Sequence, residues 1–218
     1  LVYCSNYMND QQAEDYLISH VEGEHITQPR KIRFKTGTRR QHWNKNCVAM
    51  GLSSGFLEPL ESTSIHLIQQ AIVRLMRMFP VNGIQQCDVD EFNQQTSTDV
   101  ESIRDFIILH YKVTQRDDSD YWRHCRNMTV PDSLAHRIEL FSQTGRLFRK
   151  NNELFDDSWM QVMIGQGLIP QSHHPIVDNM SDDELNRFLQ TIKSSQQEKV
   201  AGLPFHQQFI DHFCKSAP

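Results

Sequence analysis

The sequence predicts an α+β chain in which a few short strands come first and a mainly helical region follows. Short apolar runs separated by glycine-containing turns occupy residues 1–62, which is typical of strands. Beyond residue 62, apolar residues recur every three or four positions, the period of an amphipathic helix. The strands are too few for a complete sheet, and the chain opens directly in an apolar run. We therefore expect a fragment whose strands pair with those of a preceding segment.

The first 62 residues hold one expected helix among strand segments. Asn9 and Asp10 are both suitable helix caps. Ile32 and Phe34 alternate with basic residues, which is the period of a half-buried strand. In order, we expect a strand end at residues 1–4, a helix at 9–20, a strand at 31–35, a turn at 36–37 and a buried strand at 46–52.

The region after residue 62 contains most of the expected helices. One apolar stripe runs from Ile65 to Phe79 and should end at Pro80, and a second runs from Val100 to Tyr111. Asp99 is a suitable cap for the second stripe. The remaining expectations are a helix at residues 131–141, a helix after a capping box at 181–184, a polar surface loop at 194–199 and a last helix at 203–214.

Composition and charge exclude several classes of protein. The 218 residues are 38% hydrophobic and 22% charged, which is an ordinary globular balance. The net charge of −5 gives no basic face for nucleic acid, and no apolar run is long enough to span a membrane. Five cysteines without a CxxC pair indicate reduced, mostly buried thiols of a cytoplasmic protein. His173 and His174 lack a third ligand at useful spacing, so we expect no metal site.

Residues 46–68 are the segment most suited to chemistry. Gly51 and Gly55 allow a backbone to approach a ligand closely. Ser62, Thr63 and Ser64 stand where the next helix begins, and the unpaired N–H groups of a helix start attract anions. Serine and threonine at such a place more often serve only as caps, and a neighbouring acid such as Glu61 more often complements the helix dipole. The residues alone leave both interpretations open.

A longer string favours the anion-binding interpretation. Residues 51–65 read G-L-S-S-G-F-L-E-P-L-E-S-T-S-I, which closely resembles the G-L-S-x-x-F-L-E-P-L-E-S-T-x-I signature of flavin-dependent tryptophan halogenases. The resemblance continues in order along the chain. It includes D-F-I-I-L-H-Y at 105–111, R-D-D-S at 116–119, P-D-S-L-A at 131–135 and S-W-M-Q-V-M-I-G-Q-G at 158–167.

This resemblance implies roles for individual residues. The backbone N–H groups of Thr63 and Ser64 would bind chloride or bromide. Glu61 would be the catalytic residue and would face the aromatic substrate. The flavin-binding residues would be Leu52, Ser53, Gly55, Pro59, Ser62 and Ile65. The family often has glycine where this chain has Ser64, which matters only if that position needs a positive φ.

The resemblance also implies the reaction and its participants. A separate flavin reductase would supply reduced FAD, which reacts with oxygen to a flavin hydroperoxide. Halide would attack it to give hypohalous acid, and an indole-type aromatic would then be chlorinated or brominated. Glu61 would stabilise the cationic ring or take its proton. The resemblance leaves a homodimer open.

The substrate region matches the family only in part. Trp159 and Phe148 could hold an aromatic ring between them. Family members that take free tryptophan have a tyrosine pair where this chain has Leu147 and Phe148, and an asparagine where it has Met163. We therefore expect indole or another electron-rich aromatic rather than tryptophan. The alternative is that Trp159 is part of an ordinary hydrophobic core.

The resemblance implies two domains and an incomplete site. Residues 1–80 would be the C-terminal part of an FAD- and halide-binding domain of the flavin-monooxygenase type, and residues 81–218 a helical substrate-binding region. The family's dinucleotide motif and its catalytic lysine have no counterpart in this sequence. The isolated chain should therefore neither bind FAD tightly nor halogenate. The alternatives are a flavin-dependent aromatic hydroxylase and a helical interaction module without chemistry.

Overall fold

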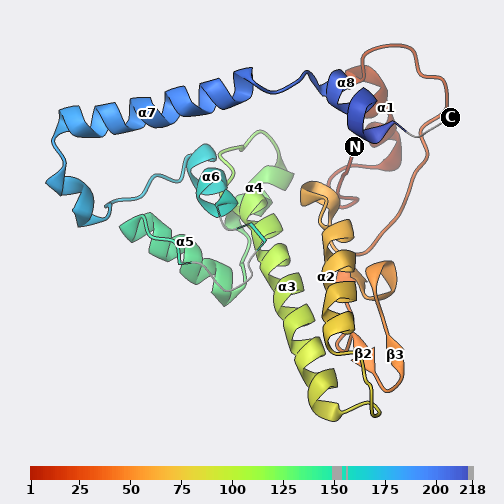
Figure 1. Cartoon of the computed structure of the whole chain (residues 1–218). Helices are drawn as coiled ribbons and strands as arrows, with labels where there is room; N and C mark the ends of the chain where they lie inside the picture. The colour runs from red at the N-terminus through yellow and green to blue at the C-terminus, as the bar shows by residue number, and fades with distance from the viewer. Residues whose placement is uncertain (149–153, 156, 216–218) are drawn as a thin grey trace. The chain divides into compact units, whose positions relative to one another are not determined.

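A computed structural model describes residues 1–148, 154–155 and 157–215 of the chain. Most of the described elements are helices (Figure 1). The elements up to the first long helix are α1 (Asp10–His20), β1 (Gly37–Thr38), β2 (Trp43–Asn44), β3 (Cys47–Val48), η1 (Gly51–Ser53), β4 (Gly55–Phe56), η2 (Pro59–Glu61) and α2 (Ser64–Arg77). The remaining ones are α3 (Gln86–Lys112), α4 (Asp120–Asn127), α5 (Asp132–Thr144), α6 (Ser158–Gly165), η3 (Pro175–Asn179), α7 (Asp182–Ala201), α8 (His206–Phe209) and the π-helical turn η4 (Ile210–Cys214).

The strands form two separate antiparallel pairs of two residues each. In one pair β1 lies beside β4, with Gly37 opposite Phe56. In the other pair β2 lies beside β3, with Trp43 opposite Val48. Because each ladder is so short, the strands serve to fold the loop before α2 back on itself rather than to form a layer of the fold.

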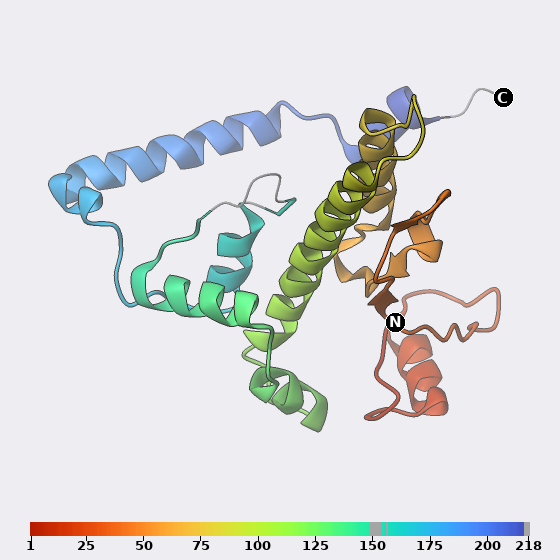
Figure 2. The ribbon, with the colours of Figure 1, turned by 90° about the horizontal axis from the view of Figure 1, so that it is seen from below.

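Helix α3 connects the two hydrophobic cores of the first 171 residues. Its N-terminal half packs beside α2, as both views show (Figures 1 and 2). The first core joins α2, β2 and α3 and consists of Trp43, Ala71, Val89 and Phe92. The second joins α3, α5 and α6 and consists of Phe106, Leu109, Leu134, Phe141, Trp159 and Met163. One rigid helix therefore carries both the loop before α2 and the region expected to bind substrate.

Polar contacts hold the loop and α2 against α3. The side chain of Asn93 on α3 accepts from the backbone N–H groups of His42 and Trp43 and donates to the Trp43 carbonyl oxygen, at 2.7, 2.8 and 2.9 Å. Arg74 of α2 donates to Thr96 at 2.9 Å and to Asp99 at 2.5 Å. These bonds fix the position of α2 relative to α3.

The expected strands differ from the structure most. Residues 1–4 and 31–35 form no strand, and the apolar ring of Phe34 instead packs edge-on against Phe56, with centroids 5.2 Å apart. The strand expected at 46–52 shrinks to β3, where Cys47 is exposed rather than buried. Cys87 and Cys214 are exposed too, so the expectation of mostly buried thiols was wrong. Alternating sequence alone does not make a strand when no neighbouring strand supplies its hydrogen bonds.

The helices agree better with the expectations, with four corrections. Helix α1 and the capping box at Ser181 are as predicted, and of the two suitable caps Asn9 is the one that α1 uses. Asp99 does not cap α3 but lies inside it, because the buried stripe starts earlier, at Val89. Helix α2 ends at Arg77, before the expected stop at Pro80. Residues 194–199 are part of α7 rather than a loop, and the expected last helix consists of the short turns α8 and η4.

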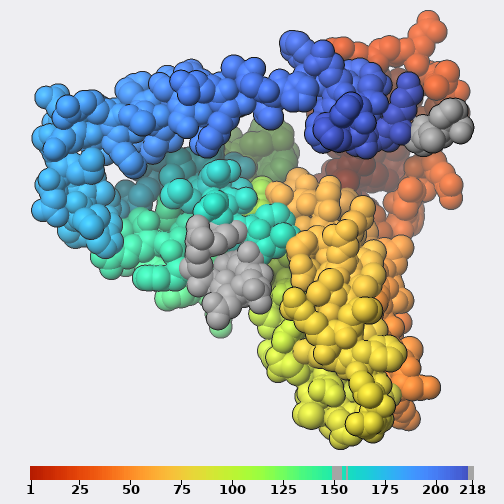
Figure 3. All heavy atoms as spheres, viewed as in Figure 1, coloured from red at the N-terminus to blue at the C-terminus, as the bar shows by residue number. Residues whose placement is uncertain are grey.

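The chain divides into two compact units, Leu1–Gln171 and Ser172–Pro218. In the first unit, α2 has an apolar face that the described residues leave open, and its atoms face the viewer in Figure 3. The exposed apolar side chains of this helix are Ile65, Ile72, Val73 and Met76. In the second unit, Phe188, Leu189 and Ile192 of α7 are exposed as well. No helix among the described residues is both long and apolar enough to cross a bilayer.

Candidate halide and flavin site

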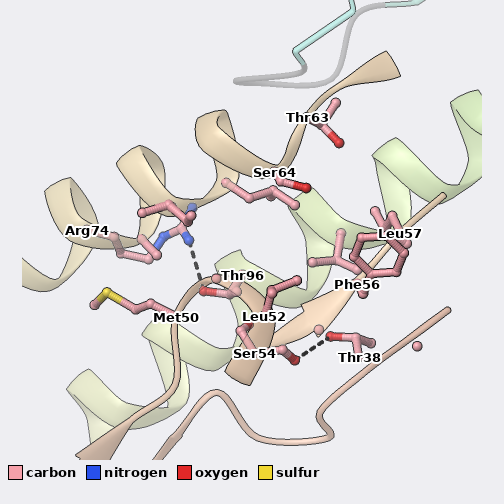
Figure 4. Close-up of a pocket in the computed structure, with 17 residues that line it drawn as sticks. Thr38, Met50, Leu52, Ser54, Phe56, Leu57, Thr63, Ser64, Arg74 and Thr96 are labelled. Atoms are coloured by element: carbon pink, nitrogen blue, oxygen red, sulfur yellow. Dashed lines mark hydrogen bonds between the residues drawn. The ribbon is translucent and has the colours of Figure 1, made fainter. Parts of the chain in front are cut away.

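A small pocket forms where the loop before α2 meets the start of that helix. Its volume is about 80 Å³, and Leu52, Gly55, Thr63 and Ser64 are among the residues that line it. Figure 4 shows Leu52 of the loop and Ser64 of α2 on this same pocket. A pocket of this size suits an ion or a small group, because drug-sized ligands need roughly 300 Å³ or more. The structure thus brings together the residues predicted to bind halide and two of those predicted to bind flavin.

Hydrogen bonds hold the loop that forms one wall of the pocket. The Ser53 hydroxyl donates to the Met50 carbonyl oxygen at 2.7 Å, and the Met50 N–H donates to the Ser53 hydroxyl oxygen at 3.1 Å. Behind the loop, a ring nitrogen of buried His42 lies 2.6 Å from the Ser54 hydroxyl. Burial lowers the pKa of His42, so its ring stays neutral at neutral pH. The loop is therefore set in place without any ligand.

Gly55 is required by the backbone that passes behind it. A Cβ atom at this position would lie 2.7 Å from the Gly37 carbonyl oxygen and 2.9 Å from the Thr38 Cα atom. Both of these are backbone atoms of β1, the partner strand of β4. A side chain at position 55 would push the two strands apart. Glycine is therefore needed here for the loop to keep its shape.

At the start of α2, no side-chain cap hydrogen bond to the first N–H groups is found among the residues that the structure describes. Ser62 adopts the left-handed conformation, with φ 51° and ψ 36°, and its N–H bonds to the Pro59 carbonyl. Thr63 occupies the cap position, yet its side chain makes no cap hydrogen bond. Ser64 has no positive φ, so a serine fits here without strain. Donors of this kind at a helix start suit a small anion.

Glu61 lies beside this helix start and pairs with a histidine of α3. Its Oε1 is 2.7 Å from the Nε2 of His110, and both side chains are only partly exposed. His110 is held in turn by a 2.8 Å hydrogen bond between its Nδ1 and the Phe106 carbonyl oxygen. No role was assigned to His110 from the sequence, and this contact was missed. The only signal was its place in the D-F-I-I-L-H-Y string.

The other residues predicted to contact flavin line no part of the small pocket. Ile65 is 70% exposed, and Leu52, although on the pocket, is 79% exposed. Pro59 and Ser62 are also exposed, on either side of Glu61. Apolar side chains this open, next to a preformed loop, leave a surface for another group to cover.

The two aromatic residues predicted to hold the substrate differ in their surroundings. Trp159 is only 2% exposed, its ring 4.9 Å from that of Phe106 and 4.0 Å from the Arg137 guanidinium carbon. Its indole N–H is buried and has no hydrogen-bond partner among the described residues. Phe148 is 68% exposed. Their joint contact with a substrate remains a prediction, and Trp159 is at the same time part of the core.

An aromatic cluster near the end of α3 was not foreseen. The Tyr111 hydroxyl donates to Glu58 Oε2 at 3.2 Å, and its ring stacks on Trp122, with centroids 6.1 Å apart. Burial and the neighbouring Glu58 carboxylate raise the pKa of Tyr111 to about 12, so it remains a hydrogen-bond donor at neutral pH. The Arg116 guanidinium lies 4.4 Å from the Trp122 ring centroid. Among the described residues, no group of His, Cys, Asp or Glu side chains could hold a metal ion.

Comparisons with known proteins show which family the chain resembles. A family model described as tryptophan halogenase matches residues 1–182. The chain is 35% identical over 179 residues to the 7-chloro-L-tryptophan 6-halogenase KtzR of Kutzneria sp. (strain 744), covering 77% of this chain and 34% of KtzR. It is 35% identical over 173 residues to the tryptophan 6-halogenase SttH of Streptomyces toxytricini, covering 77% of this chain and 33% of SttH. The chain thus spans about a third of the length of these relatives.

Solved structures show the same likeness over nearly the whole chain. Xcc4156, a flavin-dependent halogenase from Xanthomonas campestris, superposes with a TM-score of 0.93 and 48% identity over 99% of this chain and 44% of that one. BrvH, a flavin-dependent halogenase from Brevundimonas sp. BAL3, gives a TM-score of 0.90 and 47% identity over 97% and 43%. This chain belongs to the tryptophan halogenase family.

Proposed function

We propose that this chain is the C-terminal portion of an FAD-dependent halogenase that chlorinates or brominates an indole-type aromatic. Residues 1–80 complete the FAD- and halide-binding domain, and residues 81–218 form the substrate-binding region. The supporting observation is the uncapped start of α2, where Thr63 and Ser64 meet the rigid loop carrying Leu52, with Glu61 alongside. The complete enzyme is the polypeptide in which the N-terminal half of a halogenase of this family precedes this chain.

The residues of the site fit a halide and the edge of a flavin. The N–H groups of Thr63 and Ser64 are the donors for the halide, and the open side chains of Leu52 and Ile65 are the apolar surface for the ring system. Ser53, Gly55, Pro59 and Ser62 complete the flavin-facing segment. Reduced FAD, supplied by a separate reductase, would activate molecular oxygen, and oxygen would be the oxidant that converts halide into hypohalous acid. The chain's own part is to hold the anion beside it.

Glu61 is the group that acts on the aromatic substrate. A carboxylate close to a ring that becomes cationic stabilises that charge, and it can take the ring proton afterwards. Glu61 is only partly exposed, so its charge is less screened than that of a surface acid. We assign no catalytic role to the lysines of this chain, because the catalytic lysine of the family belongs to the N-terminal half.

The substrate proposed is indole or a similar electron-rich aromatic. Several relatives are named for action on tryptophan, whose carboxylate and amine need polar partners. Met163, at the family's asparagine position, is fully buried in the core, and Leu147 packs against that core. Neither side chain can bind a charged group. Glu153, which lies one residue out of register with the family's glutamate, falls outside the described residues.

The test is turnover by the complete enzyme with a flavin reductase, oxygen and either chloride or bromide. We expect a halogenated indole, identified by its isotope pattern in mass spectrometry, and a lower kcat/KM for tryptophan than for indole. Glu61→Gln should lower kcat roughly 100-fold or more, because it removes the charge and the proton acceptor. A hydroxylated product formed without halide would instead identify an aromatic hydroxylase.

The isolated 218-residue chain provides a second test. Because it lacks the family's dinucleotide motif and lysine, we expect no tight FAD binding in a flavin fluorescence titration and no product. The complete enzyme is the matched control. Stoichiometric FAD binding by the isolated chain would contradict this part of the proposal.

A further inference from the structure

We propose that His110 is a positioning residue that holds Glu61 through a charged hydrogen bond and leaves one carboxylate oxygen free for the substrate. The inference rests on the proposed function of Glu61. It assigns a role to a residue of α3, a helix outside the loop that resembles the family signature.

The hydrogen count of the contacts requires an extra proton. A carbonyl oxygen only accepts, so the Nδ1 of His110 must carry a hydrogen and donate it to the Phe106 carbonyl at 2.8 Å. The Nε2 lies 2.7 Å from Glu61 Oε1, and a contact this short needs a second hydrogen between the two atoms. In the proposal this second hydrogen is on Nε2, so that Nε2 donates to Glu61 Oε1 while Nδ1 donates to Phe106. The pair is then an imidazolium and a carboxylate.

The position of His110 in its helix favours this charged state. His110 stands in the last turn of α3, together with Lys112. The carbonyl groups at a helix C-terminus carry partial negative charge, which stabilises a cation there. Glu61 supplies a full negative charge on the other side of the ring. The helix C-terminus and Glu61 therefore both stabilise the positive charge of the imidazolium.

The surroundings also hold the imidazole ring still. Its edge meets Phe106 at 81°, with ring centroids 4.8 Å apart. Phe106 is 1% exposed and stacks on Phe155, with centroids 4.2 Å apart, and it also contacts Trp159. His110 is thereby anchored to the second core, and through it Glu61 is fixed to the same core as the residue expected to contact substrate.

This arrangement makes the two oxygens of Glu61 unequal. Oε1 accepts from His110, whereas no contact of Oε2 is found among the described residues. When the halogenated ring loses its proton, Oε2 forms the new O–H bond and the electron pair of the broken C–H bond returns to the ring. The imidazolium keeps its own proton. The net charge of the Glu61–His110 pair thereby rises from zero to +1. It returns to zero when Oε2 releases the proton to water.

The kinetic test compares His110→Gln and His110→Phe in the complete enzyme. Glutamine keeps an N–H donor near the Nε2 position but loses the charge, whereas phenylalanine keeps the ring packing and loses both. We expect kcat to fall roughly tenfold for His110→Gln and roughly 100-fold for His110→Phe, with KM for the aromatic unchanged. Release of hypohalous acid, measured with a chlorinatable dye in solution, should continue at the wild-type rate. A raised KM with unchanged kcat would overturn the proposal.

The double variant Glu61→Gln/His110→Phe checks that the histidine acts through the acid. We expect it to be no slower than Glu61→Gln alone, since residues that act as a unit are not additive. Equal independent losses would overturn the positioning role. If His110→Phe does not fold, as judged by its melting temperature, the glutamine variant supplies the same comparison.

The protonation state is tested without turnover by histidine-selective ¹⁵N NMR of the complete enzyme. We expect both ring nitrogens of His110, assigned with His110→Gln, to be protonated at pH 7.5, and one proton to be lost in Glu61→Gln. A neutral ring in the wild-type protein would overturn the inference. If this signature is present but no halide-dependent product forms, the proposed function fails and the pair itself stands.

Discussion

Helices α2 and α7 both have a serine or threonine at the cap position, and they begin in different ways. At the start of α7, the Ser181 hydroxyl accepts from the Glu184 N–H, and the Glu184 carboxylate accepts from the Ser181 N–H at 2.9 Å. At the start of α2, Thr63 stands at the cap position and makes no side-chain cap bond. Serines on both sides of Thr63 do not replace it. A run of three cap-forming residues has thus produced the less satisfied of the two helix starts.

The difference shows what each helix start is suited for. A complete capping box satisfies the first N–H groups internally and stabilises the helix. An uncapped start retains donors and the positive end of the helix dipole, at a cost in local stability. Since the uncapped start of α2 also lines a pocket, it is the one suited to an anion. Three predictions test this comparison, in order of expected effect.

The largest effect should come from a charge placed at the open helix start. In the complete enzyme, Ser64→Asp should raise the halide KM roughly tenfold or more, because two negative charges in a pocket repel each other. The same carboxylate should stabilise α2 by about 0.5 kcal/mol through the helix dipole. Ser64→Asn, of nearly equal size and uncharged, is the matched control. Steady-state rates against chloride concentration measure the effect, and equal KM values for the two variants would refute halide binding here.

A smaller effect should follow from removing the cap of α7. Ser181→Ala should destabilise this helix start by about 1 kcal/mol, because it removes the side-chain acceptor of the capping box. Hydrogen exchange of the first-turn amides of α7 should speed up about fivefold. The matched change at the cap position of α2, Thr63→Val, removes the hydroxyl at nearly constant size and should leave the exchange at the start of α2 unaltered. Faster exchange there would mean that the Thr63 side chain does cap α2 in solution.

The smallest effect should come from relieving the turn before α2. Ser62 is left-handed at φ 51°, a conformation that costs a non-glycine residue about 1 kcal/mol. Ser62→Gly removes this cost but adds unfolded-state entropy, so we expect a net gain of about 0.5 kcal/mol. The melting temperature of the complete enzyme should rise slightly. A decrease would show that the Ser62 side chain contributes more than its backbone conformation costs.

Helices and the site segment could largely be predicted from the sequence. Amphipathic period located α2, the start signal Pro131-Asp132-Ser133 located α5, and the capping pattern located the start of α7. The long string at residues 51–65 identified Thr63, Ser64 and Glu61, and the structure places them at one helix start. These signals are local, so neighbouring residues carry them.

The errors arose where distant residues decide the structure. The strand expected at 31–35 has no partner strand within the described part of the chain, and sequence alternation could not show this. The polar stretch at 194–199 ends in the good helix formers Gln196, Gln197, Glu198 and Lys199 and continues α7, whereas polarity alone suggested a loop. The contact of Glu61 with His110 joins residues 49 positions apart, and no local pattern reports such a pair. Tertiary contacts set the outcome in all three cases.

The three hydrogen bonds of Asn93 have a consequence for synthesis of the chain. They join α3 to backbone groups 50 and 51 residues earlier, and the loop and α2 lie between the joined points. Contacts this distant form late, because closing a long loop costs entropy before any contact is gained. On the ribosome, the segment with Thr63 and Ser64 emerges before its support does. It can settle only once α3 has left the exit tunnel, and a chain stalled earlier would leave the Ala71 side of α2 uncovered and open to chaperones.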